Sequence, residues 1–318
     1  MAKTWVFTEV FNGKVDPVAL EILTKARDFG GELEAVALGP GATDAAKELG
    51  EHGATTVYAS DDTVYDEFVA QPAAHALNEL IKEHSPDLVL FAMNYDSRDI
   101  AGRLSALTGA TLMSNVMDFA SPERPKTAIF GGATIVEVDL EGSPKLALVR
   151  PKSFEAEASG GTANVEAVNV EIPDELKKAK RIEKHEEETT GPKLEEAAIV
   201  ISGGRGLQDP SNFELLDQLA AALGGAAVGA TRAVVDAGWV PYAKQVGQTG
   251  VTVKPGVYMA FGISGATQHL VGMKGAKKII AVNKDEDAPI FQIADLGVVG
   301  DALQVLPKLI EEIKARKG

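Results

Sequence analysis

The chain has 318 residues, enough for about two domains with separate cores. Hydrophobic residues make up 45% and charged residues 24% of it, a balance that excludes a disordered or fibrous chain. Acidic residues outnumber basic ones by 46 to 31, a formal net charge of −15, so we expect no nucleic acid partner. Cysteine is absent, which excludes disulfides, thiolate nucleophiles and cysteine-ligated metals. Any redox chemistry therefore requires a bound cofactor.

We expect a cytoplasmic protein, since no stretch of the sequence reads as a targeting or membrane-spanning segment. The first ten residues read directly as a strand, without a basic leader or an apolar signal core. The longest run of small apolar residues, 219–230, is too short to cross a bilayer.

In the first half of the chain, apolar runs alternate with amphipathic stretches. Strands are expected at residues 4–8, 33–38, 56–58 and 88–91, and helices at 17–29, 43–49, 66–83 and 99–107. This alternation predicts a mainly parallel sheet with helices on both faces. Residues 129–138 and 145–149 alternate with a period near two, which predicts a closing antiparallel ribbon.

A highly charged stretch, residues 174–196, separates the two halves. It lacks an apolar face and contains Gly191-Pro192, so it predicts a linker or an exposed helix. A docking segment for a partner is the alternative that these residues leave open. We place the domain boundary in this stretch, with one domain at residues 1–190 and a second at residues 191–318.

The second half repeats the strand–helix alternation with more glycine at its turns. Strands are expected at residues 197–202, 226–230, 257–263, 278–282 and 291–294, and helices at 212–223, from about residue 268, and at 302–315. The predicted fold class is therefore α/β, with two domains that are each a mainly parallel sheet flanked by helices.

Two predicted strands of the second half end in positively charged, glycine-containing turns. In residues 202–206, SGGRG, the glycines allow backbone N–H groups to approach a phosphate, and Arg205 adds a forked positive charge. Thr231 and Arg232 follow the next strand, where an open parallel sheet gathers its ligands. The dinucleotide and P-loop fingerprints are missing, so a plain glycine turn and a helix-capping threonine beside a surface arginine remain alternatives.

Three later stretches are also polar. Residues 245–250, QVGQTG, contain two amides, a hydroxyl and two glycines, which predicts a ligand loop, with a polar hairpin turn as the alternative. Residues 262–269 join a strand to a helix and include His269. Asn283 ends a strand, and Asp301 opens the last helix, where an N-cap role alone explains it.

No catalytic constellation accompanies these clusters. The sequence has no nucleophile elbow, no H-E-x-x-H motif and no paired carboxylates in a glycine cradle, so we expect neither catalytic residues nor a metal site. The clusters predict a domain that holds a large dinucleotide rather than one that cleaves a substrate.

Residues 257–283, VYMAFGISGATQHLVGMKGAKKIIAVN, resemble the signature of electron transfer flavoprotein alpha subunits. Residues 231–250 look like that family's flavin loop, and residues 288–295, APIFQIAD, also fit. The resemblance is specific in the second half, whereas the first half is similar in layout only. It implies that residues 191–318 form a Rossmann-like FAD-binding domain and that residues 1–190 make the subunit contact.

The resemblance also implies individual roles at the flavin. Arg205 would meet the FAD pyrophosphate, and Arg232 would lie over the isoalloxazine ring. Thr231 keeps a hydroxyl where the family often has serine. Thr249 would lie near N5 of the flavin and His269 near its O2 carbonyl. A guanidinium and an imidazole at that edge would stabilise the negative charge that reduction places there.

The remaining roles concern the phosphates and the adenosine. Residues 264–269 would hold the phosphates and the flavin, although Thr267 departs from the usual aliphatic residue. Asn283 and Asp301 would contact the adenosine half. The complete expected set is Arg205, Thr231, Arg232, Val246, Gly247, Gln248, Thr249, Ser264, Gly265, Ala266, Thr267, Gln268, His269, Asn283 and Asp301.

The function implied by the resemblance is electron transfer rather than substrate conversion. The chain would be the FAD-holding alpha subunit of a heterodimer whose beta subunit carries AMP. It would accept electrons from acyl-CoA and related dehydrogenases in fatty acid beta-oxidation and pass them to a membrane quinone oxidoreductase. Two alternatives stay open: an electron-bifurcating flavoprotein subunit that uses NADH, and a nucleotide-binding module without a redox role.

Overall fold

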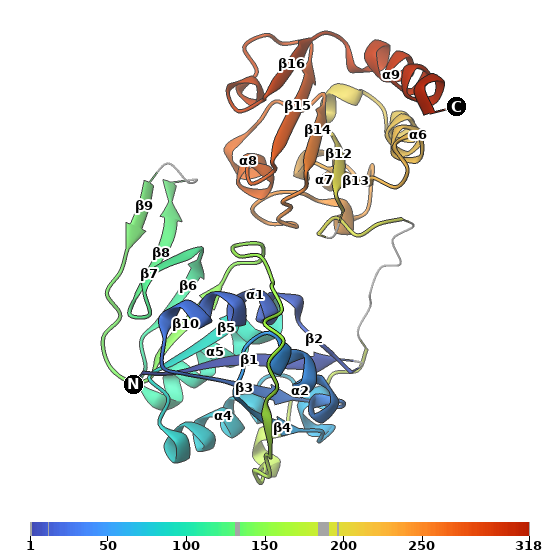
Figure 1. Cartoon of the computed structure of the whole chain (residues 1–318). Coiled ribbons are helices and arrows are strands. Elements are labelled where there is room, and N and C mark those ends of the chain that lie inside the picture. The colour runs from blue at the N-terminus through green and yellow to red at the C-terminus, as the bar shows by residue number, and fades with distance from the viewer. Residues whose placement is uncertain (1, 12, 131–133, 184–190, 196, 318) are drawn as a thin grey trace. The chain divides into compact units, whose positions relative to one another are not determined.

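The computed structural model describes residues 2–11, 13–130, 134–183, 191–195 and 197–317 (Figure 1). The chain divides into two compact units, Met1–Lys184 and His185–Gly318. The boundary expected at residue 190 lies outside the described residues.

The N-terminal unit is built on a sheet of strand order β11-β4-β3-β1-β5-β10-β6, in which all neighbours on this path are parallel. Its strands are β1 (Lys3–Phe11), β3 (Glu32–Leu38), β4 (Thr56–Ser60), β5 (Leu88–Ala92), β6 (Leu112–Val116), β10 (Lys145–Val149) and β11 (Asn164–Ala167). The short β2 (Lys14–Val15) pairs antiparallel with β1.

Helices cover both faces of this sheet, as the alternation of strands and helices predicts. The helices are α1 (Pro17–Ala26), α2 (Ala42–Glu51), α3 (Val64–Glu67), α4 (Gln71–His84) and α5 (Tyr95–Thr108), with 3₁₀ turns at Arg27–Phe29 and Asp174–Leu176. Successive strand residues point to opposite faces, so Val6 packs with α1 and α2, whereas Phe7 packs with α4 and α5.

The expected antiparallel ribbon is partly wrong. Residues 145–149 form β10, a parallel strand between β5 and β6. Leu146 to Val149 are buried on both faces, which is the environment of an interior parallel strand. The ribbon consists instead of β7 (Asp118–Ser121), β8 (Arg124–Ile129) and β9 (Thr134–Glu137), which pair antiparallel and project from the sheet (Figure 1).

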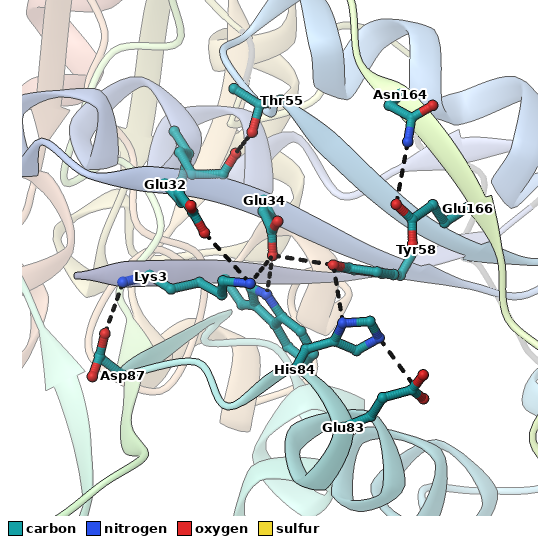
Figure 2. A network of polar contacts seen from close by, with 12 residues as sticks. Lys3, Glu32, Glu34, Thr55, Tyr58, Glu83, His84, Asp87, Asn164 and Glu166 are labelled. Atoms are coloured by element: carbon teal, nitrogen blue, oxygen red, sulfur yellow. Dashed lines mark hydrogen bonds and ion pairs between the residues drawn. The ribbon is translucent and has the colours of Figure 1, made fainter. Parts of the chain in front are cut away.

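A network of polar and aromatic side chains ties β1, β3, β4 and α4 together (Figure 2). The carboxylate of Glu34 is buried and accepts a hydrogen bond from Trp5 Nε1 at 2.7 Å and one from the Tyr58 hydroxyl at 3.4 Å. Lys3 Nζ lies 3.6 Å from the same carboxylate, and the Tyr58 hydroxyl lies 3.3 Å from His84 Nδ1. Because these partners compensate the buried charge, the network holds the sheet to α4.

The charged stretch at residues 174–196 begins as part of the N-terminal unit, and residues 184–190 and 196 lie outside the description. Arg181 donates to Asp66 Oδ1 at 2.7 Å and to Asp96 Oδ2 at 2.8 Å. Its backbone N–H also donates to the carbonyl of Glu67. The part of the stretch up to Arg181 is therefore anchored on the N-terminal unit.

The C-terminal unit is built on a parallel sheet of strand order β13-β12-β14-β15-β16. Its strands are β12 (Ile199–Gly203), β13 (Ala227–Ala230), β14 (Val257–Phe261), β15 (Lys278–Asn283) and β16 (Leu296–Val299). The chain runs from β12 outward to β13 and then returns to β14 on the other side. The strand order thus reverses between β12 and β14, and in an open α/β sheet ligands bind at the carboxyl ends beside such a reversal.

Helices flank this sheet as well. They are α6 (Phe213–Leu223), α7 (Arg232–Asp236), α8 (Thr267–Met273) and α9 (Ala302–Lys317), with 3₁₀ turns at Arg205–Leu207, Pro210–Asn212, Tyr242–Lys244 and Pro289–Gln292. Leu216 of α6 and Leu306 of α9 belong to one apolar cluster, and Met273 of α8 belongs to the other. The predicted fold class, α/β with parallel sheets flanked by helices, is confirmed.

The strand expected at residues 291–294 is wrong. The segment begins with the 3₁₀ turn Pro289–Gln292, and the strand follows at Leu296–Val299. The N–H of Ile290 donates to the carbonyl of Ser264, in the connection between β14 and α8, instead of to a neighbouring strand. Proline at the start of the turn also favours this local structure over a strand.

Within the described residues, none of the helices combines the length and the apolar character that crossing a membrane requires.

Candidate functional site

A cavity of about 670 Å³ lies in the C-terminal unit, where the connections that follow β12, β13, β14 and β15 meet. It is lined by Gly204, Arg205, Gly206, Thr231, Arg232, Ala233, Asp236, Gln245, Val246, Gly247, Gln248, Thr249, Gly262, Ile263, Ser264, Ala266, Gln268, His269, Asn283 and Asp285. Most of the residues expected at the cofactor are therefore brought together. Gly265, Thr267 and Asp301 are not among the lining residues.

Two glycine turns cross at one wall of the cavity. The N–H of Gly206 donates to the carbonyl of Gly262 at 3.0 Å, and a Cβ on Gly206 would lie 2.5 Å from the Cα of Gly262. Gly262 also has a φ of 63°, in the left-handed region that favours glycine. Only glycine therefore lets the connections after β12 and β14 approach this closely. The exposed Arg205 lies between Gly204 and Gly206 on this wall.

Thr231 and Arg232 mark the step from β13 to α7. Thr231 occupies the N-cap position with extended backbone, yet its side chain makes no capping hydrogen bond. Arg232 is the first residue of α7, and its Nε lies 3.1 Å from Oδ2 of Asp236, one turn further on. The helix thereby presents a hydroxyl, a guanidinium and a carboxylate to the same cavity.

The loop at residues 245–250 is fastened to α8. The N–H of Gln248 donates to the carbonyl of Gln268 at 2.8 Å, and Gln245 Nε2 donates to Thr249 Oγ1 at 3.0 Å. On the helix side, a Cβ on Gly272 would lie 2.4 Å from the backbone nitrogen of Gly247. The absence of a side chain at Gly272 therefore allows the loop to lie directly on the helix.

His269 connects this loop to the core. The residue is 6% exposed, with Nδ1 at 3.0 Å from the carbonyl of Val246 and Nε2 at 2.9 Å from the Tyr258 hydroxyl. Burial lowers the pKa of His269 to about 4, so the imidazole is neutral at pH 7. Arg205 and Arg232, not His269, thus supply the positive charge among the lining residues.

Asn283 connects two of the segments that line the cavity. Its Nδ2 donates to the carbonyl of Ile263 at 2.9 Å, and its Oδ1 accepts from the N–H of Asp285 at 3.0 Å. The amide thus joins the end of β15 to the connection that follows β14. Asp301 is not a lining residue and caps α9, with Oδ1 accepting from the N–H of Leu303 at 2.9 Å.

Sequence reasoning missed several lining residues, of which Asp236 and Asp285 are charged. Asp236 follows Arg232 by four residues, the spacing of an ion pair on a helix, which is a signal that the sequence contains. Asp285 comes two residues after Asn283 and carries no comparable pattern.

Two family models match the chain, one in each unit. The model described as "Electron transfer flavoprotein domain" matches residues 4–174, and the one described as "Electron transfer flavoprotein FAD-binding domain" matches residues 193–274. The chain belongs to the electron transfer flavoprotein alpha subunit family. The resemblance identified in the sequence is thereby confirmed, and membership implies an electron-transfer protein that binds a flavin.

Proteins from several bacteria are similar in sequence to this protein over nearly its whole length. The protein named "Electron transfer flavoprotein subunit alpha" in Mycobacterium tuberculosis (strain ATCC 25618 / H37Rv) is 44% identical, with 100% of both chains covered. The protein of that name in Syntrophomonas wolfei subsp. wolfei is 39% identical, over 99% of this chain and 100% of the relative. "Protein FixB" of Clostridium saccharobutylicum is 37% identical, over 98% of this chain and 96% of the relative.

Proposed function

We propose that this protein is an electron carrier that holds one FAD in the cavity of its C-terminal unit. The observation that carries the proposal is the convergence of two arginines, two glycine turns and an amide-rich loop on one cavity of about 670 Å³. That volume falls in the range of cofactor sites. The family model for an FAD-binding domain, at residues 193–274, supports the same choice of flavin.

The residues present fit a dinucleotide. Gly204, Gly206 and Gly262 line one wall of the cavity without side chains, which suits close approach of a pyrophosphate to the backbone. Arg205 would bind that pyrophosphate, and Asn283 and Asp301 would contact the adenosine half. Residues 264–269 would hold the phosphates and the flavin.

The flavin end would lie against Arg232 and the loop at residues 245–250. Bound FAD supplies the capacity to take up and release electrons. The chain contributes the fixed charge of Arg232, which favours the added negative charge, and the hydroxyls of Thr231 and Thr249. Because its imidazole is neutral, His269 would act by positioning rather than by charge.

The partners belong to the same proposal. The N-terminal domain, residues 1–190, would contact an electron transfer flavoprotein beta subunit that carries AMP. The cytoplasmic heterodimer would accept electrons from acyl-CoA dehydrogenases in fatty acid beta-oxidation and pass them to a membrane quinone oxidoreductase. What supports this is similarity over the full chain to relatives named as alpha subunits.

An electron-bifurcating subunit that uses NADH is the second candidate. The observation that favours it is the relative named "Protein FixB", which is 37% identical. The flavin content separates the two candidates. One FAD and one AMP per heterodimer support the simple carrier, whereas two FAD and reduction by NADH support the bifurcating protein.

The proposal is tested by co-expressing the chain with a beta subunit and purifying the complex. We expect a yellow complex whose visible spectrum bleaches on stepwise reduction and which releases FAD on denaturation. Arg205→Ala should lower the FAD content, and the matched control Arg103→Ala, in the N-terminal unit, should not. A colourless complex that takes up no added FAD contradicts the proposal and favours a nucleotide-binding module without a redox role.

A further inference from the structure

A chain of hydrogen bonds runs from the core of the C-terminal unit to the cavity wall. It begins at Tyr258 in β14, which is fully buried and is not a lining residue. The Tyr258 hydroxyl lies 2.9 Å from Nε2 of His269, and Nδ1 of His269 lies 3.0 Å from the carbonyl of Val246. The hydroxyl of Tyr258 is therefore hydrogen-bonded to a lining residue, His269.

The partners of the imidazole determine where its proton is. The carbonyl of Val246 can only accept, so Nδ1 of His269 carries a hydrogen and donates it. In the neutral ring Nε2 then accepts, and the Tyr258 hydroxyl is the donor. Burial lowers the pKa of His269 to about 4 and raises the pKa of Tyr258 above its usual value, so both groups keep these protons at neutral pH.

The orientation of the His269 imidazole decides whether it can hydrogen-bond to the loop that lines the cavity. Residues 246–249 are joined to α8 by the bond from His269 to Val246 and by the bond from the Gln248 N–H to the Gln268 carbonyl. The backbone of Gly247 rests on Gly272 between these two bonds. If the imidazole turned, the loop would lose the hydrogen bond between His269 Nδ1 and the carbonyl of Val246.

We propose that Tyr258 is a positioning residue of the cavity, whose hydroxyl holds the His269 imidazole in the tautomer that fastens the loop at residues 246–249 to α8. Tyr258 itself touches no ligand in this arrangement. The consequence for FAD retention rests on the proposed function, whereas the hydrogen-bond chain is a property of the protein alone.

Tyr258→Phe tests the hydrogen bonds that link Tyr258, His269 and Val246, because the substitution keeps the aromatic ring and removes only the hydroxyl. The measurement uses the purified full chain labelled with ¹⁵N-histidine. We expect the ¹⁵N resonance of His269 Nε2 to move toward the position of an unprotonated ring nitrogen that accepts no hydrogen bond. His269→Gln assigns the resonance among the five histidines. Backbone amides in residues 246–251 should exchange faster with deuterium in Tyr258→Phe. Unchanged His269 resonances together with unchanged exchange overturn the proposal.

Tyr58→Phe is the matched control. It also removes a tyrosine hydroxyl that faces a histidine ring, that of His84 in the N-terminal unit (Figure 2). We expect it to leave the His269 resonances and the exchange of the loop unchanged. If Tyr58→Phe alters both as much as Tyr258→Phe does, the effect is not specific to the chain and the proposal is wrong.

Retention of FAD by the complex gives the second measurement. Loss of one hydrogen bond should speed FAD release by up to about tenfold in Tyr258→Phe. Because Tyr258 acts through His269, Tyr258→Phe should add nothing in a His269→Gln background, and additive effects contradict the proposal. A wild-type complex without FAD refutes the proposed function, while the resonances and the exchange still decide the role of Tyr258.

Discussion

Arg232 and Asp236 form an ion pair within α7, with Arg232 Nε 3.1 Å from Asp236 Oδ2, and both side chains line the same cavity. The two side chains are 66% and 61% exposed, so water screens the pair and it contributes little to folding. Its effect falls on the cavity instead, because the carboxylate offsets part of the positive charge that Arg232 offers to a bound group.

Arg232→Ala should therefore separate folding from redox behaviour. We expect the free energy of unfolding to change by less than about 0.5 kcal/mol, as is usual for exposed sites. Reduction of the bound flavin should become less favourable by about 1 kcal/mol per electron, which is the interaction energy of unit charges about 4 Å apart in water. The reduction potential should therefore become more negative. Asp236→Asn should shift the potential in the opposite direction. Spectroelectrochemical titration measures both, and shifts of the same sign in the two variants contradict the prediction.

Gly272→Ala should displace the loop at residues 245–250. The new Cβ would lie 2.4 Å from the backbone nitrogen of Gly247, which has no flexible side chain to yield. We expect a loss of about 1–3 kcal/mol in stability and a lower FAD content. Gly102→Ala in α5 is the control, because nothing lies within 4 Å of its Cβ and alanine favours a helix. Full FAD content in Gly272→Ala contradicts the close contact.

Much of the cavity could be predicted from the sequence, because strand ends in a parallel sheet meet at one edge. Arg205 and Arg232 follow strands and Asn283 ends one, so recognising the strands is enough to bring them together. The loop at residues 245–250 is predictable as part of a ligand site, because amides and glycines rarely cluster in a core, and residues 245–249 do line the cavity.

Strand pairing was harder to predict, since it depends on contacts between distant residues. The buried run of β10 looks the same whether its neighbours are parallel or antiparallel. The break in the helix expected at residues 66–83 has a local cause: Ala70 has a φ of 53°, and Pro72 lies in the first turn of α4. The hydrogen bonds that link Tyr258, His269 and Val246 could not be predicted from the sequence, because they join residues of β14, α8 and a loop.

Asp301 has two roles to distinguish, the helix cap and the expected adenosine contact. Asp301→Ala should cost about 1 kcal/mol, because the N–H of Leu303 loses its acceptor. Asp301→Asn should retain the cap, because asparagine is an equally good N-cap. If the carboxylate also contacts adenosine, only FAD affinity should fall in Asp301→Asn. Urea unfolding and FAD titration separate the two roles, and a large loss of stability in Asp301→Asn contradicts the cap.

Glu21 in α1 should make the stability of the N-terminal unit depend on pH. Its side chain is buried, and burial raises its pKa from 4.5 to about 7, although Lys152 and the backbone N–H groups of Phe154 and Lys152 oppose the shift. Between these two values the folded state binds more protons than the unfolded state. The contribution of Glu21 therefore favours folding at low pH and is lost as the pH rises from about 4.5 to 7.

Glu21→Gln should remove this dependence, because the amide has a similar shape and does not ionise. We expect the variant to gain stability relative to the wild type at pH 7.5 compared with pH 5, measured by urea unfolding of the purified chain. Lys152→Gln should steepen the wild-type dependence, because it removes the charge that favours the ionised carboxylate. Glu48→Gln, an exposed site in α2, serves as the control. A Glu21→Gln profile parallel to that of the wild type would show that the carboxyl titrates alike in both states.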